Sequence, residues 1–527
     1  MVKINILFFL LSFNVIMAQD QETIGLVYND FNKTKSEGYT LIKPTNDNRV
    51  FLINNCGEVV NQWDATGDGV SRSYFLENGN LLLSNGTNAE IRDWDNNIVW
   101  SISYSDLGFV THHDIAPLSN GNFLVLVRDV YSKSEMVGHG LDVSFPDDDF
   151  QLERIIEIEP LGSNSANLVW EWKAFDHLIQ DFDSSKDNYG VVANNPQLFD
   201  LNYGNQSNFM HVNAINYNEE LDQIVFSARN LNEIYIIDHS TTTIEAGKHD
   251  GGIYGKGGDI LWRWGNPEVY DNGIVADRKL NGQHDVKWIT EGPNQGKISV
   301  FNNAGYGSDF AASSIHIIDQ NHTEGVYTLN SGKYLPEDYF WSWDGVIMST
   351  VMHEGKKSGV QFMSNGNALI NESGKGRITE VDNMGNVIWV YIIPAGNNSN
   401  YNQFSQPGVN EAFRVTRYSE NYIGFNGLTF NNTGIIEDVN SISANCVNML
   451  SDDDSYYVNL NVYPNPTKTI LNFTKQIDEI KVYDISGKVV LNKANSDFVN
   501  LESLRIGLYL IGLFEDEKSV IFKITKN

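Results

Sequence analysis

The sequence predicts an all-β protein, because one strand pattern recurs along most of its length. In each repeat an apolar segment reaches a tight turn rich in Asn, Asp and Gly, a second strand leaves the turn, and a later strand ends on tryptophan. The closing tryptophans of the six repeats are Trp63, Trp100, Trp170 with Trp172, Trp262 with Trp264, Trp341 with Trp343, and Trp389. Units of about four strands cannot bury both sheet faces alone, so they stack radially. The predicted fold is a six-bladed β-propeller followed by a small C-terminal β-sandwich.

The turns between the first and second strands are the clearest part of the repeat. Asn-Gly-Asn stands at residues 78–80, 120–122 and 365–367. Asn-Gly readily adopts the positive φ angles that a two-residue hairpin needs. We therefore expect a two-residue hairpin at each of these places.

Uneven spacing between the tryptophans indicates insertions into the repeats, the first of which begins near Gly38. The longest insertion is residues 130–150, with an acidic cluster at 147–149, and residues 180–208 are similar in character. We expect both to be exposed loops, and long loops on one face of a propeller usually frame its site. Residues 413–430 could return to complete the ring, but the sequence assigns them to no blade.

The two ends of the chain differ from the repeats. Lys3, an apolar run at 4–17 and the small Ala18 predict a signal peptide over residues 1–18. No other stretch is apolar enough to predict a transmembrane segment. The propeller domain is then expected over 19–450 and an acidic linker over 451–456. Residues 457–527 alternate apolar runs with Gly and Asn turns, which predicts a small sandwich of about seven strands.

Charge and cysteine content limit the possible functions. The 527 residues include 36 Lys and Arg against 67 Asp and Glu, a formal net charge of −31. Nucleic acid is therefore not an expected partner, because phosphate binding needs clustered cations. An anionic substrate would need a local positive site. Cys56 and Cys446 lie near the two ends of the repeat region. The sequence is compatible with a disulfide that joins these ends and with two buried thiols.

Three histidines occupy matching places in successive repeats. His113 leads into the turn at 120–122, His211 opens the fourth repeat and His284 opens the fifth. The first strand of a propeller blade lines the central channel, so these side chains are expected to meet around the axis. Ser71 and Ser358 stand at the same distance before the turns of the second and sixth repeats.

Arg229 and His112 are further candidates for this site. Arg229 follows the apolar strand 224–228, and its buried charge needs an anionic partner, either an internal carboxylate or a substrate oxyanion. His112 adjoins the motif, and which of His112 and His113 faces the site stays open. The repeat pattern gives no reason to place His139, His177, His239, His249 or His353 in the site.

Several motifs, taken in order, resemble the bacterial arylsulfate sulfotransferase family over about residues 38–430. They are His-Asp-Ile at 113–115, His-Val-Asn at 211–213, Phe-Ser-Ala-Arg-Asn at 226–230, Leu-Trp-Arg-Trp-Gly at 261–265 and Gln-His-Asp at 283–285. The resemblance implies transfer of a sulfuryl group from a phenolic sulfate ester to a phenol acceptor, without a nucleotide sulfate donor, cofactor or metal. It implies a covalent sulfohistidine at His284, with His113, His211 and Arg229 as further catalytic residues. The chain lacks room for the N-terminal sandwich of the best-known members, which leaves the substrate range open.

The C-terminal segment has its own resemblance. Tyr-Pro-Asn-Pro at 463–466, Ser-Gly-Lys at 486–488 and Gly-Leu-Tyr at 507–509 resemble, in order, the C-terminal sorting domain of the type IX secretion system of Bacteroidetes. This implies the type IX secretion machinery as a partner, and a protein secreted or held at the cell surface.

These residue types suit sulfuryl transfer. A neutral imidazole is a nucleophile that adds no negative charge, flanking His⁺ and Arg groups neutralise sulfuryl oxygens, and a histidine can move the phenolic proton. Asp114 and Asp285 either orient imidazoles or cap turns. Two alternatives remain: the three histidines could hold zinc or another metal, which the Arg disfavours, or the propeller could bind a ligand or partner without catalysis.

Overall fold

The computed structural model describes residues 23–66, 72–304, 312–431, 433–438, 446, 462–464, 466–484, 488–515 and 518–527. By its internal contacts the chain forms two compact units, Met1–Ile442 and Ser443–Asn527. The predicted signal peptide (1–18), the predicted linker (451–456) and Ser71 lie outside the described residues.

Antiparallel sheets make up most of the N-terminal unit. Sheet 1 contains β35 (Ala412–Ser419), β2 (Gly38–Pro44), β3 (Arg49–Ile53) and β4 (Val59–Asp64). Sheet 2 contains β5 (Arg72–Phe75), β6 (Leu81–Ser84), β7 (Asn88–Arg92) and β8 (Ile98–Ser103). Sheet 3 contains β9 (Thr111–Pro117), β10 (Phe123–Tyr131), β11 (Phe150–Leu161) and β12 (Ser165–Lys173). Sheet 4 contains β15 (Val212–Asn218), β16 (Gln223–Ala228), β17 (Glu233–Asp238) and β18 (Trp262–Trp264). Sheet 5 contains β19 (His284–Trp288), β20 (Ile298–Asn302), β21 (Ser314–Ile318) and β26 (Trp341–Trp343). Sheet 6 contains β29 (Gly359–Phe362), β30 (Ala368–Glu372), β31 (Arg377–Val381), β32 (Val387–Ile392) and β1 (Gly25–Asn29).

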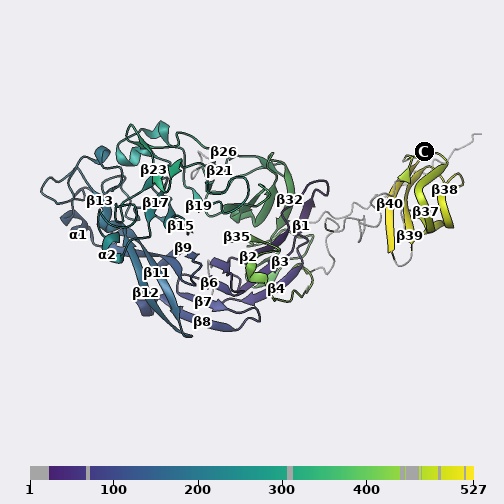
Figure 1. Cartoon of the computed structure of the whole chain (residues 1–527), viewed down its shortest axis with the longest axis horizontal. Coiled ribbons are helices and arrows are strands. Elements are labelled where there is room, and N and C mark those ends of the chain that lie inside the picture. Colours follow the sequence, from purple (N-terminus) through teal and green to yellow (C-terminus); the bar gives the residue numbers. More distant parts are fainter. Residues whose placement is uncertain are drawn as a thin grey trace, which may run out of the picture. The chain divides into compact units, whose positions relative to one another are not determined.

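The first strands of these sheets form a closed series. β35 contacts β5, β5 contacts β9, β9 contacts β15, β15 contacts β19, β19 contacts β29, and β29 returns to β35. In Figure 1, β9, β15, β19 and β35 surround the middle of the unit, and β4, β8 and β12 lie on its outer side. The unit is therefore all-β and propeller-like. β35 also accounts for residues 413–419, which the sequence left unassigned: they pair with β2 and so join the two ends of the unit in one sheet.

The closing tryptophans have a common physical role. All six of the predicted positions lie in the fourth strand of a sheet, and each sheet donates one indole N–H to a backbone carbonyl of the following sheet. The six bonds are Trp63 to Asp93 (2.9 Å), Trp100 to Ser165 (2.8 Å), Trp172 to Gly258 (2.7 Å), Trp262 to Leu335 (2.8 Å), Trp343 to Gly385 (3.1 Å) and Trp389 to Asn55 (2.8 Å). A buried indole needs a partner for its N–H. The recurrent tryptophan therefore fastens each sheet to the next one.

The Asn-Gly-Asn turns differ from the prediction. Only the glycines have positive φ, 82° at Gly79, 90° at Gly121 and 85° at Gly366. In the first turn the side chain of Asn78 accepts a hydrogen bond from the Asn80 N–H (3.1 Å), and the other two turns repeat this bond. The expected two-residue hairpin is wrong: the Asn side chain closes its own turn, and Gly takes the left-handed position of a longer loop.

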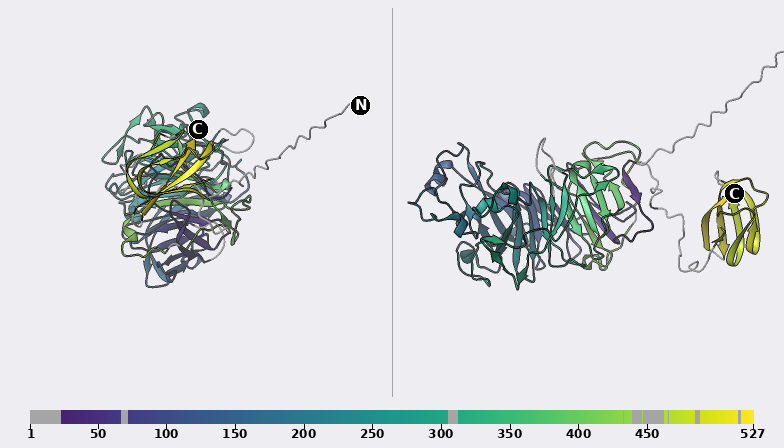
Figure 2. Two further views of the ribbon diagram at one scale, coloured as in Figure 1. Left: turned by 90° about the vertical axis from the view of Figure 1, so that its right-hand side faces the viewer. Right: turned by 90° about the horizontal axis from the view of Figure 1, so that it is seen from above.

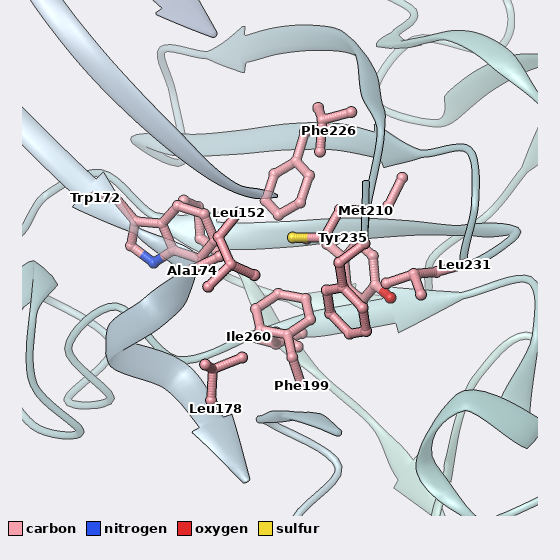
Figure 3. Packing of buried hydrophobic residues seen from close by; sticks show 14 of the residues in the cluster. Leu152, Trp172, Ala174, Leu178, Phe199, Met210, Phe226, Leu231, Tyr235 and Ile260 are labelled. Carbon is pink, nitrogen blue, oxygen red and sulfur yellow. The ribbon is translucent and has the colours of Figure 1, made fainter. Parts of the chain in front are cut away.

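A continuous apolar core lies between sheets 3 and 4. Figure 3 shows Trp172, Phe199, Phe226 and Tyr235 packed with the aliphatic side chains around them. Phe226 stacks on Tyr235 with ring centroids 5.3 Å apart. Close packing of this kind makes the border between the two sheets rigid.

The predicted insertions are only partly exposed. Residues 147–149 are exposed, but Met136, Leu141 and Phe145 of the same segment are buried. Short helices occur in such connections; they are α1 (Lys133–Gly138), α2 (Thr243–Ala246), η1 (Tyr104–Leu107), η2 (Ala174–His177), η3 (Val192–Asn194), η4 (Pro267–Tyr270), η5 (Val275–Asp277), η7 (Ser373–Lys375) and η8 (Ile423–Phe425). Short strand pairs also occur there; they are β13 (Leu178–Ile179) with β14 (Phe199–Asp200), β22 (His322–Thr323) with β23 (Val326–Tyr327), β24 (Leu329–Asn330) with β25 (Lys333–Tyr334), β27 (Val346–Ile347) with β28 (Thr350–Val351), and β33 (Ala395–Gly396) with β34 (Ser399–Asn400).

The C-terminal unit is also built from strands. One sheet contains β36 (Val462–Tyr463), β37 (Ile470–Tyr483), β38 (Val489–Asn500), β39 (Gly507–Glu515) and β40 (Lys518–Lys526). Figure 2 shows the long strands of this unit side by side. The sequence predicted about seven short strands, whereas the described part of this unit has fewer and longer ones. For example, β37 continues past the register shift that follows Asn472.

Two further expectations can be compared with the structure. Cys56 and Cys446 are both disulfide-bonded, so the alternative of two free thiols is not observed. Within the described part of the chain, no helix is long and apolar enough to span a membrane.

His239 links sheets 3 and 4 and makes stability depend on pH. Its Nε2 lies 2.9 Å from Glu157 and its Nδ1 lies 2.7 Å from Asp222. Burial alone would lower the pKa of His239, but the hydrogen bonds to the two carboxylates raise it to about 9. Because this folded-state pKa exceeds the value of about 6.5 in an unfolded chain, the stabilisation is complete below pH about 6.5 and is lost as pH rises through 9.

We expect the free energy of unfolding to fall by up to about 3 kcal/mol between pH 6.5 and 9, and His239→Gln to reduce that fall. Urea unfolding of both proteins across this pH range measures it. The control is His139→Gln, at an exposed position. An identical pH dependence in His239→Gln and the wild type would refute the role of His239.

Candidate functional site

The three predicted histidines lie at β-bulges where the first strands of sheets 3, 4 and 5 begin. The register shifts between Val125 and Val127 opposite β9, between Val212 and Ala214 in β15, and between His284 and Lys287 in β19. A bulge redirects a side chain out of the regular pleat, and bulges are common next to active sites.

The histidines do not occupy the same backbone position in all three sheets. His113 and His211 have left-handed φ angles of 52° and 49°, which are uncommon for residues with a Cβ. In sheet 5 the corresponding angle, 56°, belongs to Asp285, and His284 comes one residue earlier. The residue with the left-handed φ angle is therefore the histidine itself in sheets 3 and 4, and the residue after the histidine in sheet 5.

The side chains nevertheless converge. The rings of His113 and His211 have centroids 4.6 Å apart. Burial lowers the pKa of His113, and His112, His211, Arg72 and His284 lower it further. These imidazoles and the Arg72 guanidinium are therefore near enough to act on the charge of His113.

His113 belongs to a chain of hydrogen bonds that ends on a carboxylate. Its Nδ1 lies 2.8 Å from Nδ1 of His112, and Nε2 of His112 lies 2.6 Å from Glu153. A carboxylate only accepts, so His112 Nε2 donates, and the Nδ1 of a neutral His112 accepts from His113. His113 then carries its lone pair on Nε2, and His112 acts through His113.

His211 has the opposite tautomer. The Asn208 amide donates to its Nδ1 at 2.9 Å, so Nε2 of the neutral ring carries the proton. Glu153 also accepts from the Val212 N–H (3.0 Å), which places the carboxylate beside the backbone of His211. Burial and the positive charge of Arg229 lower the pKa of His211 to about 4.

The hydrogen bonds of His284 place its lone pair on Nε2. Its Nδ1 donates to the Gly282 carbonyl (3.0 Å) and to Asn303 Oδ1 (2.8 Å), so Nε2 carries the lone pair. Nε2 accepts a long hydrogen bond from the Lys357 N–H at 3.2 Å. Burial lowers the pKa of His284 to about 3, although the bond to Asn303 opposes this and Arg229 adds to it.

Arg229 lies just beyond the strand on which the sequence placed it. β16 ends at Ala228, and the Arg229 N–H donates to the His211 carbonyl at 3.3 Å. Its guanidinium donates to Asn230 Oδ1 at 2.9 Å, and burial lowers the pKa of Arg229 to about 10. The Arg229 charge therefore stays in place at neutral pH and acts on both His211 and His284.

Asp114 and Asp285 neither orient an imidazole nor cap a turn. Both bind Arg414 of β35, at 2.9 Å for Asp114 Oδ2, and Asp285 forms a second ion pair with the same guanidinium. They also accept from N–H groups of the next sheet, those of Ile215 (3.3 Å) and Val360 (2.8 Å). In addition, the Tyr74 hydroxyl donates to Asp114 and Lys287 pairs with Asp285, each at 3.0 Å. The two carboxylates therefore bind sheets 3 and 5 to sheet 1 directly beside His113 and His284.

Sequence reasoning missed several of these residues. Arg414 stands in the segment that was assigned to no blade, and Arg72 follows the Ser71 that was counted as the equivalent of His113. Glu153 is one of three glutamates in strand β11 and is followed by Arg154, so it carries no signal that sets it apart. Asn208, Asn303 and Lys357 carried no such signal.

Two sizeable cavities lie away from the histidines. One of about 650 Å³ is lined by Leu118, Asn218 and Trp288, at the far ends of the first strands. The other, of about 610 Å³, lies beside Phe175 and His249. In the described ranges the group of His, Asp and Glu donors close enough to hold a metal is also at His249, not among the central histidines.

Comparisons with known proteins show the family to which the chain belongs. The arylsulfotransferase (ASST) family model matches residues 72–393, which is more than half of the chain. The chain therefore belongs to the arylsulfotransferase family. The model of the secretion system C-terminal sorting domain matches residues 461–527, which indicates export, handling by the secretion machinery, and a surface or secreted location. A search of curated proteins finds no match.

Similarities to solved structures concern the fold alone. A protein of unknown function from Bacteroides caccae is 13% identical, with 68% of this chain and 93% of that chain covered and a TM-score of 0.38. The β-propeller domain of Cps50 (Swd1) from Myceliophteria thermophila is 9% identical, with coverage of 69% and 89% and a TM-score of 0.36. Virginiamycin B lyase from Staphylococcus aureus is 12% identical, with coverage of 70% and 91% and a TM-score of 0.32. These similarities are too distant to support an argument about function.

Proposed function

We propose that the chain is an aryl-sulfate sulfotransferase that works through a covalent sulfohistidine, on a six-bladed β-propeller with a C-terminal sandwich for sorting. The observation that carries the proposal is the His284 ring. Asn303 and Gly282 fix its tautomer with the lone pair on Nε2, where the long bond from the Lys357 N–H has to give way to the substrate, and the charge of Arg229 acts on the ring. A nucleophile activated in this way is suited to attack on sulfur.

In the first half-reaction, Nε2 of His284 attacks the sulfur of a phenolic sulfate, and the bond from sulfur to the phenolic oxygen breaks. The leaving phenolate takes the Nε2 proton of His211 after the bound anion has converted that ring to imidazolium, and a neutral ring remains. In the second half-reaction an acceptor phenol returns its proton to His211 as its oxygen attacks the sulfur. The bond between sulfur and His284 then breaks.

Charge in the site favours an anionic substrate. His113, His211 and His284 all have lowered pKa values, so these imidazoles are neutral at pH 7 and Arg229 supplies positive charge beside them. The expected His⁺ beside the nucleophile then requires the charge of a bound anion. A bound sulfate ester would reverse part of this shift, because an anion favours protonated imidazole. His113 and Arg229 are then placed to stabilise the sulfuryl oxygens.

We expect the mature protein to release nitrophenol from 4-nitrophenyl sulfate at a rate that rises strongly when phenol is added. Water is a poor acceptor if the sulfuryl group waits on His284 for a phenol. Absorbance of nitrophenol and chromatography of phenyl sulfate measure the two products. Release that does not respond to any of several phenols, with no phenyl sulfate formed, would reject a transferase.

A further inference from the structure

Three metal-binding side chains converge at the border of sheets 3 and 4, away from the central histidines. His177 ends η2, His249 follows α2, and Asp259 precedes β18. Nδ1 of His177 lies 2.8 Å and Nδ1 of His249 lies 2.7 Å from the same atom, Oδ1 of Asp259. In the part of the chain that the structure describes, donor atoms of this group all lie within 4.8 Å of one another.

The hydrogen bonds of His177 leave its inward nitrogen as an acceptor. Its Nε2 lies 2.8 Å from the Ala246 carbonyl oxygen, which can only accept, so Nε2 carries a proton. In the neutral ring the Nδ1 lone pair then points at a carboxylate oxygen. Two lone pairs facing each other repel, and a positive charge between them, either a second proton or a metal ion, removes the repulsion.

The surroundings of His177 are those of a metal ligand. Ligating histidines usually donate their second N–H to a carbonyl or carboxylate, as His177 does to Ala246. Trp172 stacks on the imidazole with centroids 5.6 Å apart and donates to the Gly258 carbonyl, next to Asp259. A Cβ on Gly258 would lie 2.1 Å from the Ala246 oxygen, so only glycine lets the two loops approach this closely.

One side of the group is rigid and the other is open. His177 and Asp259 are buried, and the core behind them includes Trp172, Leu178 and Ile260, all visible in Figure 3. The His249 side chain is 63% exposed and lines the cavity of about 610 Å³. Donor atoms about 2.0–2.1 Å from a tetrahedral Zn²⁺ are roughly 3.3 Å apart. Both distances to Asp259 Oδ1, 2.8 Å from His177 and 2.7 Å from His249, therefore have to widen by about 0.5 Å to admit the ion.

We propose that Nδ1 of His177, Nδ1 of His249 and the carboxylate of Asp259 bind one Zn²⁺ ion. Two imidazole nitrogens and a carboxylate are a ligand set that zinc accepts, and three protein ligands leave one position for water or a ligand in the cavity. The ion ties the loop between β17 and β18 to η2. This inference is independent of the proposed sulfotransferase chemistry.

The test uses the full mature protein, treated with EDTA and transferred to metal-free buffer. Calorimetric titration with ZnCl₂ alone should show one high-affinity site, and elemental analysis after gel filtration should find one zinc per chain. His249→Gln changes an exposed side chain and should weaken zinc binding at least about 100-fold. His139→Gln, which removes another histidine of the same cavity, should bind zinc like the wild type.

Thermal unfolding gives a second readout. Saturating zinc should raise the Tm of the wild type and of His139→Gln, and should leave the Tm of His249→Gln unchanged, because a ligand stabilises only the state that binds it. No zinc uptake by the wild type would mean that a proton alone joins His177 to Asp259, and would overturn the proposal. Equal zinc affinity in His249→Gln and the wild type would overturn it as well. Asp259→Asn removes another ligand, but Asp259 is buried, so this variant could lose stability for reasons unrelated to zinc. The exposed His249 therefore provides the main test.

Discussion

His284→Asn should lower the rate of sulfuryl transfer from 4-nitrophenyl sulfate to phenol by roughly 10⁴-fold or more, the scale on which loss of a nucleophile acts in covalent enzymes. Asn can keep a hydrogen bond to Asn303 but has no lone pair that can form a bond to sulfur at neutral pH. Initial rates of phenyl sulfate formation at saturating phenol measure the loss. Rapid quenching followed by mass spectrometry should find one added sulfuryl group on the wild type and none on the variant.

The matched control is His139→Asn, an exposed histidine that packs on Phe175. It should transfer at the wild-type rate. If His284→Asn keeps more than about a tenth of the activity, or carries the sulfuryl group on another histidine, the nucleophile has been assigned to the wrong residue.

The repeat could be predicted from the sequence because its signals are local. A tryptophan near the end of each fourth strand reports a bond that every sheet makes to the next, so it recurs at each of the six places. The Asn-Gly-Asn turns were recognised in the right places, but their type was not. The hydrogen bond from the backbone to the Asn side chain stabilises a longer loop and so competes with the two-residue hairpin. The sequence alone does not show which of these two conformations forms.

The candidate site was predicted less completely, since its partners come from distant parts of the chain. The histidines could be found by counting from the turns, and the resemblance to a family ranked them. The bulges at which the histidines lie could not be found in this way, because each bulge depends on how the first strand of a sheet pairs with the second. Arg414 lies 300 residues from Asp114 in sequence, and its role appears only when β35 closes the ring.

Arg414 is also the residue whose loss should cost the most stability. Its guanidinium is buried between Asp114 and Asp285, donates to the Asn213 carbonyl at 3.1 Å, and packs over Phe413. Burial alone would lower the pKa of Arg414, but the two carboxylates raise it, so the cation persists at all ordinary pH values. Removing it takes away the cation that the two buried carboxylates share, and Asp285 keeps its ion pair with Lys287 at 3.0 Å.

We expect Arg414→Met to lower the free energy of unfolding by about 3–5 kcal/mol, the usual cost of breaking a buried ion pair from one side. Urea unfolding measures this loss. Arg278→Met is the control: its partner Glu268 is 3.3 Å away and partly exposed, so its loss should cost no more than about 1 kcal/mol.

The loss of stability in Arg414→Met is expected to come from the buried charges of Asp114 and Asp285. In that case the triple variant Arg414→Met, Asp114→Asn, Asp285→Asn should recover part of the stability that Arg414→Met loses. Recovery is expected because neutral amides keep the size of the carboxylates without their charge. Equal stability of Arg414→Met and the wild type would show that the ring of first strands does not depend on this ion-pair group. A loss that the triple variant does not relieve would assign the role of Arg414 to packing over Phe413 instead.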